Sequence, residues 1–553
     1  MIITLASFWA IVIPIIVAVV LLRYGRIAIR SSSLPPGPST IPFLGILTCY
    51  DGFEQVSHVL LGNLHQIPTT KAYLRFQKWS KTYGPILGLK VGPGNLIVLN
   101  SATAVKELFE KRGAIYSSRP PNHIGAELIT RGNTHLLLMP YGQEWRDQRK
   151  VYQSILSITA VTALQPLQAA EATLTMSQLL RSPEKYYDHI RRYSTAVILS
   201  SVFGIRGPTF DHPNIQRLYD VQDQFTAILE TGATPPVDIF PFLKYLPTFL
   251  APWRKWALSI RAKQHQLYFE LLKNVQDRMQ RGIHRICFMD DMLSKSKRTK
   301  YALDDEHIAY IGGVLMEGGS DTTASTILSF LMAMIKYPSV LRRAQAEVDK
   351  VCGVQRSPNF EDIGKLEYIR HCMTETLRWR PVAAGGIPHT LTEDDVYQGY
   401  HFPKGSTFLA NTWAIHHDRE VYDRPEDFTP ERYEKNLLGF KDSPEDSASI
   451  RKTYAFGAGR RICPGQHLAE SSLLINMAKL VWVFDILPGK DNATGKQLSS
   501  SDIDDSIATG WTNGFLTAPK EFPVSLVMRS PKHARIIDEE CAEAQEVFKA
   551  YED

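Results

Sequence analysis

A short glycine-rich stretch near the carboxyl end of the chain presents one cysteine in a setting suited to metal ligation. It begins at Phe456, reads FGAGRRICPG, and is followed by helix-forming residues. Gly459 and Gly465 allow a tight turn and a close approach to the sulfur, and Arg461 supplies positive charge that favours a thiolate. A lone cysteine is otherwise most often structural. The complete pattern F-x-x-G-x-R-x-C-x-G instead predicts that the thiolate of Cys463 binds a metal.

A second candidate for chemistry lies in an apolar stretch around residue 320. Residues 318–323 read GGSDTT, which places the carboxylate of Asp321 beside the hydroxyl of Thr322. Such a pair can relay protons, and the two glycines leave room for a small bound ligand. In an ordinary helix the threonine would donate to a carbonyl of the preceding turn and the aspartate would be solvated. These residues alone leave both interpretations open.

Several pairs recur at helical spacing. The spacing E-x-x-R occurs at residues 367–370 and again at 375–378, and Trp145 and Arg149 lie one helical turn apart. Ion pairs of this spacing are common on solvent-exposed helices, and the second kind of pair also fits an ordinary basic helix face. The pairs therefore identify no function by themselves.

Taken together and in this order, the segments resemble the cytochrome P-450 superfamily of haem-thiolate monooxygenases. The likeness runs from the N-terminal segment and Pro35-Pro-Gly-Pro38 to the cysteine loop, and leaves only the acidic tail unaccounted for. It implies that Cys463 is the axial ligand of the iron of haem b. It also implies that Asp321 and Thr322 are catalytic residues that guide protons to bound oxygen.

The resemblance also assigns the remaining site residues. The residues expected to bind the cofactor are Trp145, Arg149, His389, Phe456 and Arg461. His389 stands at a position where the family often has an arginine. Only the second E-x-x-R pair is followed by the family's proline, so Glu375 and Arg378 are expected to be buried and the pair at 367–370 to be exposed. Arg432, in a segment reading PERY, is expected to complete a structural charge network with Glu375 and Arg378.

The reaction implied by the resemblance is the oxidation of a lipophilic small molecule. It would use O2 and electrons from NADPH, delivered by a separate NADPH-cytochrome P-450 reductase, with cytochrome b5 as a further candidate partner. The chain has no dinucleotide-binding fingerprint of its own. Four residues are candidates for a basic face that docks the reductase, or are simply solvated charges: Arg146, Lys150, Lys452 and Arg460.

The substrate is the least determined part of this interpretation. Family position places the pocket walls at 123–139, at 315 and 318, at 382–387 and at 509–515, which are mostly apolar or small residues. The residue pattern of 381–418 resembles that of filamentous-fungal members of the family, which act on polyketides, terpenoids or small aromatics in secondary metabolism. The alternatives are a haem-thiolate isomerase or dehydratase, a monooxygenase of xenobiotics or primary metabolism, and a non-enzymatic membrane receptor.

The composition is that of a globular protein and disfavours other classes. Of 553 residues, 44% are hydrophobic and 22% charged, and 62 basic against 57 acidic side chains give a net charge of +5. This balance gives nucleic-acid binding no support and argues against wholesale disorder. The six cysteines form no C-x-x-C pair, which disfavours a zinc site or a disulfide scaffold.

The N-terminus predicts a membrane anchor. Residues 1–22 carry no charged side chain and are long enough to cross a bilayer as a helix, and Arg23, Arg26 and Arg30 follow them. This order favours a retained single-pass anchor over a cleaved signal peptide, and places the rest of the chain in the cytosol at the endoplasmic reticulum membrane.

The body of the chain predicts a mainly α fold with small β-sheets. Helical periodicity favours helices over 71–83, 102–111, 143–156, 256–281, 305–336, 339–351 and 360–378, with strands at 86–91, 95–99 and 407–410. No internal repeat divides the body, so we expect one large haem domain of the cytochrome P-450 type behind the anchor. The expected organisation is an anchor at 1–22, a basic and Pro-rich hinge at 23–39, the monooxygenase domain at 40–530 and an acidic tail at 531–553. The end of that tail is expected to form a peripheral, frayed helix.

Overall fold

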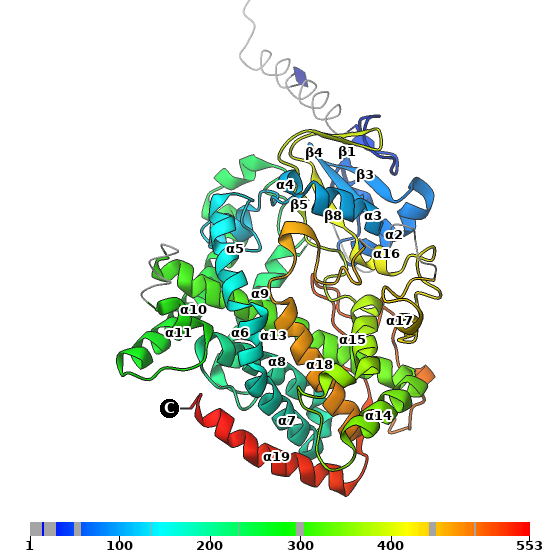
Figure 1. Cartoon of the computed structure of the whole chain (residues 1–553). Helices are drawn as coiled ribbons and strands as arrows, with labels where there is room; N and C mark the ends of the chain where they lie inside the picture. The colour runs from blue at the N-terminus through cyan, green and yellow to red at the C-terminus, as the bar shows by residue number, and fades with distance from the viewer. Residues whose placement is uncertain are drawn as a thin grey trace, which may run out of the picture.

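A large helical body carries a six-stranded sheet at one end (Figure 1). This computed structural model describes residues 14–15, 29–48, 57–132, 134–230, 232–294, 303–441, 450–491 and 494–552. The mainly helical fold with small sheets that the sequence predicts is confirmed.

The α-helices form most of the described chain and are listed here in order: α2 Ala72–Tyr83, α3 Ala102–Val105, α4 Gly113–Tyr116, α5 Gln143–Ile155, α6 Ile158–Ala163, α7 Gln165–Arg181, α8 Tyr186–Phe203, α9 Pro213–Leu229, α10 Pro252–Gln280, α11 Phe288–Leu293, α13 Asp305–Lys336, α14 Pro338–Cys352, α15 Glu367–Trp379, α16 Thr412–His416, α17 Arg432–Lys435, α18 Gln466–Val483 and α19 Pro531–Lys549. Two further segments are wound as π-helices, η2 Lys106–Lys111 and η3 His123–Ile129.

The strands form one larger sheet and two hairpin-like pairs. The larger sheet has the order β1 Ile41–Thr48, β2 Ser57–Gly62, β3 Ile86–Val91, β4 Gly94–Leu99, β8 Thr407–Ala410 and β5 His389–Thr390. β4 and β8 run parallel and the other neighbours are antiparallel. The two small pairs are β6 Asp395–Tyr397 with β7 Tyr400–Phe402, and β9 Phe484–Pro488 with β10 Val524–Met528.

Helix α13 is the central element of the helical body. It packs against α8, α10, α15 and α18, and it is buried along most of its length. The carboxylate of Asp304 starts the helix by accepting the backbone N–H of His307 at 2.8 Å. A helix that is apolar on nearly all sides belongs in the middle of a large core, which is where α13 lies.

Most helices predicted from periodicity are confirmed, with two differences. The segment expected as one helix over 102–111 changes from α-helix to π-helix at Lys106. The helix expected over 360–378 begins only at Glu367, because Glu347 of α14 accepts the backbone N–H groups of Tyr368 at 2.7 Å and Ile369 at 3.0 Å. This carboxylate from another helix accepts hydrogen bonds from N–H groups of the first turn that have no partner within α15, and it thereby determines where α15 starts.

Helices α6 to α9 were not anticipated from the sequence. α8 shows the reason, since its residues from Arg192 to Phe203 are all buried. A helix surrounded by protein needs no polar face, and without one the period of 3.6 residues is hard to detect.

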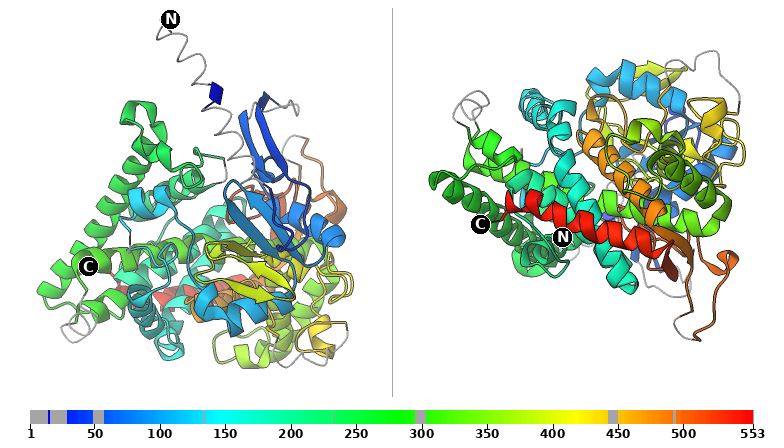
Figure 2. Two further views of the ribbon diagram at one scale, coloured as in Figure 1. Left: turned by 90° about the horizontal axis from the view of Figure 1, so that it is seen from above. Right: turned by 60° about the horizontal axis from the view of Figure 1, so that its bottom comes forward.

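The acidic tail is not frayed, so that expectation was wrong. α19 lies along α7, as the right-hand view of Figure 2 shows with α19 in red. Ile537 and Phe548 are fully buried. Asp538 and Glu539 are exposed on its outer face, while its apolar face is part of the folded body and Glu540 accepts the backbone N–H of Ser357 at 2.8 Å.

The predicted anchor over residues 1–22 lies outside the described residues, apart from Pro14 and Ile15. Within the described part of the chain, no single helix is both long and apolar enough to cross a membrane. Only α13 and α14 together meet that measure of length and composition, and they are bent by 109°.

Candidate active site

The cysteine loop is a tight turn that leads into α18. It contains a short 3-10 helix, Gly459–Arg461, and the backbone N–H of Cys463 donates to the carbonyl of Phe456 at 2.8 Å. Gly459 has φ +63°, and a Cβ there would lie 2.0 Å from the carbonyl oxygen of Phe109. Only glycine therefore fits this position, which confirms the tight turn, while the close approach is to the backbone of Phe109 and not to the sulfur.

Cys463 differs from the other cysteines of the described residues because it alone is exposed. It lines a recess of about 270 Å³ between α5, the start of α6 and the cysteine loop. The surrounding protein raises the pKa of the Cys463 thiol, while the backbone N–H of Gly465 and the guanidinium of Arg149 act in the opposite direction. These two groups are placed to stabilise a thiolate.

Three arginines gather beside this loop, of which Arg119 and Arg149 are buried and Arg461 is half-buried. Arg461 donates to the carbonyls of Ser117 and Met139, each at 2.7 Å, and Arg149 donates to that of Ile462 at 2.5 Å. Arg119 donates to the carbonyls of Leu137 at 2.8 Å, Pro388 at 2.5 Å and Ile387 at 3.5 Å. Among the described residues, none of the three forms an ion pair with a carboxylate.

This arginine cluster, defined as Arg119, Arg149 and Arg461, has no carboxylate counter-charge in the part of the chain that the structure describes. Burial lowers the pKa of Arg119 to about 9, and burial together with Arg119 and Arg149 lowers that of Arg461 to about 8. Such an environment strongly disfavours positive charge without a negative partner. The cluster encloses Trp145, whose ring centroid lies 4.4 Å from the Arg461 guanidinium carbon.

Two buried donors of this cluster have no partner among the described residues, namely Trp145 Nε1 and Arg149 Nε. Unpaired buried donors and uncompensated cations together call for an anion with several acceptor oxygens. A haem, with two propionates and an iron that takes a thiolate, fits this donor set and the adjacent cysteine. The residues present therefore match the cofactor that the motifs imply.

We expect Arg461→Gln to weaken the retention of haem. The variant removes a cation and charge-assisted hydrogen bonds, so haem should dissociate about tenfold faster or more. The rate is measured by transfer of haem to an excess of apomyoglobin. The exposed neighbour Arg460 supplies the matched control, since Arg460→Gln should leave the rate unchanged. Equal rates in the wild type and Arg461→Gln would show that Arg461 does not hold the cofactor.

His389 lies on the edge strand β5 and is nearly buried. Its Nδ1 lies 2.8 Å from the carbonyl oxygen of Tyr116, and its ring stacks on Phe109 with centroids 4.1 Å apart. Burial and the charge of Arg119 lower the pKa of His389 well below its ordinary value. A neutral imidazole that donates from Nδ1 presents a lone pair at Nε2. Arg119, rather than His389, is thus the residue of this pair that offers donors to a carboxylate.

Sequence reasoning missed Arg119. Its only local signal is an arginine that is followed by two prolines in a segment without other charge. The segment that carries it is separated by more than 300 residues from the cysteine loop, and only the folded chain brings Arg119 and Arg461 together.

The predicted catalytic residues Asp321 and Thr322 lie on α13 shortly after two glycines of the same helix, Gly318 and Gly319. Thr322 Oγ1 donates to the carbonyl of Gly318 at 2.8 Å. A Cβ at Gly318 would meet nothing within 4 Å, whereas one at Gly319 would come within 2.9 Å of Ile198 on α8. Gly318 therefore borders open space and Gly319 permits close packing of two helices.

Asp321 is held by an arginine of α8. Its Oδ1 lies 3.4 Å from Arg191 Nη2, and the Arg191 guanidinium stacks 3.7 Å from the ring centroid of Tyr219. Burial raises the pKa of the Asp321 carboxyl, Arg191 opposes this shift and Asp223 adds to it. Asp321 thus shares its surroundings with one cation and one further carboxylate.

We expect Arg191→Gln to change the pH dependence of turnover. Loss of the cation that opposes the effect of burial raises the pKa of Asp321 further. Where ionised Asp321 must accept a proton in each cycle, the acid limb of the pH–rate profile then moves to higher pH. Arg191→Lys, which keeps the charge, should leave that limb near its wild-type position. An acid limb that does not move in Arg191→Gln would exclude this role for the pair.

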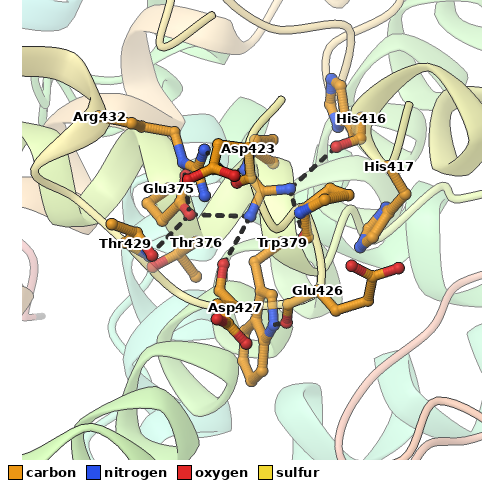
Figure 3. Close-up of polar contacts among 12 residues, drawn as sticks. Glu375, Thr376, Trp379, His416, His417, Asp423, Glu426, Asp427, Thr429 and Arg432 are labelled. Carbon is orange, nitrogen blue, oxygen red and sulfur yellow. Dashed lines mark hydrogen bonds and ion pairs between the residues drawn. The ribbon is translucent and has the colours of Figure 1, made fainter. Parts of the chain in front are cut away.

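The second E-x-x-R pair is part of a buried charge network (Figure 3). Arg378 donates to both oxygens of Glu375 at 2.8 Å, and Arg432 Nε donates to Glu375 Oε1 at 3.1 Å. Arg378 also donates to the carbonyls of His416 at 2.9 Å and Asp427 at 3.0 Å. The structure therefore places the three residues in mutual reach, and Arg378 ties α15 to the segment before α17.

The first E-x-x-R pair lies on the surface, as expected. The side chain of Glu367 is 73% exposed, and Arg370 is exposed as well. The two pairs have the same spacing on one helix, and only their rotation about the helix axis differs.

The expected pocket walls meet in part. His135 Nε2 lies 2.9 Å from Glu317 Oε2, which joins the 123–139 segment to α13 beside Gly318. The backbone N–H of Thr517, which lies just after the 509–515 segment, donates at 2.8 Å to the carbonyl of Val382, the first residue of the 382–387 segment. Glu317 was not anticipated in this wall, because only the residues at 315 and 318 were expected there from the sequence.

Comparison with known proteins gives a consistent result. A family model described as "Cytochrome P450" matches residues 53–504. The chain is 38% identical over 527 residues to "Cytochrome P450 monooxygenase yanC" of Aspergillus niger, with 94% of each chain covered. It is 39% identical over 539 residues to "Cytochrome P450 monooxygenase patI" of Penicillium expansum, with 96% of this chain and 95% of that relative covered.

Solved structures show the same fold. A zebrafish cytochrome P450 structure with progesterone is similar with a TM-score of 0.68 at 24% identity, and covers 83% of this chain and 99% of its own.

Proposed function

The chain belongs to the cytochrome P-450 family of monooxygenases, and from that premise we propose that it oxidises a lipophilic small molecule in fungal secondary metabolism. The fungal sources of the similar monooxygenases support the setting. The apolar and small residues of the expected pocket walls support the substrate class.

One observation carries the catalytic part of the proposal. Three arginines that have no carboxylate partner among the described residues lie beside the cysteine loop, where Arg149 donates to the carbonyl of Ile462, next to the exposed Cys463. In this arrangement Arg119, Arg149, Arg461 and Trp145 would hold the propionates of haem b, and Cys463 would supply the thiolate ligand. When bound, the haem supplies oxygen activation with electrons that enter one at a time.

The residues of α13 then control protons. The hydroxyl of Thr322, which donates to the carbonyl of Gly318, would hold a proton on the side of the helix that Gly318 leaves open. Asp321, held by Arg191, can take a proton from solvent and deliver it toward Thr322.

The electrons would come from NADPH through cytochrome P-450 reductase, with cytochrome b5 as a further donor. Support for a docking face is limited to exposure, since the four basic side chains named for it are all exposed: Arg146, Lys150, Lys452 and Arg460. A membrane-bound reductase also requires the catalytic domain to be held at the same membrane. The uncharged segment 1–22, as an anchor in the endoplasmic reticulum, would meet that requirement.

The test is a comparison of metabolite extracts by mass spectrometry. The native fungus is compared with a strain that lacks this chain and with that strain after the chain is restored. We expect a lipophilic compound to accumulate in the deletion strain and a product heavier by oxygen to return on restoration. A product that forms from the same compound with purified enzyme in the absence of NADPH and reductase would instead identify an isomerase or dehydratase.

A further inference from the structure

Glu317 is a buried carboxylate that the reaction described above does not use. It lies on α13 directly before Gly318 and accepts three hydrogen bonds from side chains of other elements. His135 Nε2 lies 2.9 Å from one oxygen, and Gln264 Nε2 donates to the other at 3.0 Å. The hydroxyl of Tyr268 donates to the same oxygen as Gln264. All four side chains are nine-tenths or more buried.

The hydrogen bonds to Glu317 leave one polar atom of His135 and one of Gln264 without a partner among the described residues. A carboxylate only accepts, so His135 must carry its proton on Nε2 and Gln264 must turn its NH2 group toward Glu317. In the neutral imidazole the opposite end of the ring, His135 Nδ1, is then an acceptor, and the opposite end of the Gln264 amide, Oε1, is an acceptor as well. Both atoms are buried and have no hydrogen-bond partner among the described residues. Buried acceptors without a donor carry a free-energy cost, and a bound group that donates removes it.

His135 lies between the arginine cluster and the glycine pair of α13. The next residue, Leu136, accepts a hydrogen bond from Arg461 of the arginine cluster at 3.2 Å. On the other side, Glu317 precedes Gly318, whose missing side chain leaves open space. The ring of Phe225 on α9 lies 5.6 Å from that of His135. His135 therefore stands between the cofactor-binding loop, the oxygen-activating helix and an apolar wall.

From this arrangement we propose that His135 Nδ1 accepts a hydrogen bond from a hydroxyl group of the substrate, with Glu317 as the positioning residue that holds the imidazole in its Nε2–H form. The inference deepens the proposed function, on which it rests, because it names the substrate class as a neutral lipophilic alcohol or phenol.

The local charges select a neutral donor. A carboxylate group on the substrate has no hydrogen to donate and would be repelled by Glu317. An ammonium group would lie close to the uncompensated positive charge of the arginine cluster and would be desolvated beside Phe225. A hydroxyl donates one hydrogen bond without bringing charge into this wall.

The experiment compares phenol with anisole, its methyl ether, as probes of the purified full-length haem-bound enzyme. The two probes have the same ring and an oxygen at the same place, and only phenol donates. Dissociation constants are measured from the change of the haem absorption spectrum on titration. We expect phenol to bind the wild type about tenfold more tightly than anisole, the size of effect of one buried hydrogen bond.

Two variants locate the preference. His135→Phe keeps a ring and removes the acceptor, so phenol and anisole should bind equally while the affinity for anisole stays within about threefold of the wild type. In Glu317→Gln the new amide can donate to Nε2, which allows Nδ1 to carry the proton, so the ratio of the two affinities should fall toward one. The second variant keeps a side chain of the same shape and so gives an answer even where His135→Phe does not fold.

Phenol that binds the wild type no more tightly than anisole would overturn the inference. A water molecule that permanently donates to His135 Nδ1 would give this result. A preference for phenol that survives in both variants would also overturn it. The titration needs no reductase, NADPH or product. A hydroxyl preference that depends on His135 in an enzyme without monooxygenase products would therefore refute the proposed function and leave the binding inference standing.

Discussion

Replacement of Cys463 by alanine is expected to abolish the haem-thiolate centre and to reduce oxidation of the substrate to the background rate. Alanine offers no lone pair to the iron, so the reduced carbon-monoxide complex should lose the absorption band that thiolate ligation produces. The fold should survive, because the side chain of Cys463 is exposed and takes no part in the core. Far-ultraviolet circular dichroism of the variant should therefore match that of the wild type.

The matched control is Cys541→Ala. Cys541 lies on α19 and is buried, so this variant removes a packed thiol and leaves the loop that begins at Phe456 untouched. Its carbon-monoxide spectrum and its turnover should stay at wild-type values. A thiolate-type spectrum in Cys463→Ala, or its loss in Cys541→Ala, would contradict the assignment of Cys463 as the ligand.

Replacement of Glu375 by alanine is expected to destabilise the protein by about 3–5 kcal/mol. Glu375 is the only carboxylate paired with Arg378 and Arg432 in the described part of the chain, and both guanidiniums would stay buried without it. Although burial opposes the shift, Glu375 raises the pKa of Arg378, which shows how closely the two charges are coupled. The backbone N–H of Thr429, which donates to Glu375 at 2.9 Å, would lose its partner as well.

The measurement is the urea midpoint of the haem-bound protein, followed by circular dichroism. Glu367→Ala provides the control from the same helix and the same E-x-x-R spacing. Because the Glu367 side chain is 73% exposed, its removal should change stability by no more than about 0.5 kcal/mol. Similar midpoints for the two variants would mean that the network around Arg378 contributes little to the fold.

The two E-x-x-R pairs illustrate how far local pattern reaches. Both fit a helix equally well, and the sequence separated them only through a proline that the family places after the second. The structure separates them by burial, since α15 turns Glu375 toward α17 and Glu367 toward solvent. Helical spacing shows which residues share a face of the helix. Whether that face is buried depends on neighbours from distant parts of the chain.

The sequence by itself determined the cysteine loop, the glycine pair on α13 and the bounds of helices such as α5, α13 and α14. The start of α13 shows why, because its cap on Asp304 depends on contacts within a few residues. Only the tertiary structure decided that Arg119 joins Arg461, that His135 meets Glu317, and that α19 packs on α7. The physical reason is that burial and charge compensation are properties of the folded surroundings, and residues far apart in the chain create those surroundings.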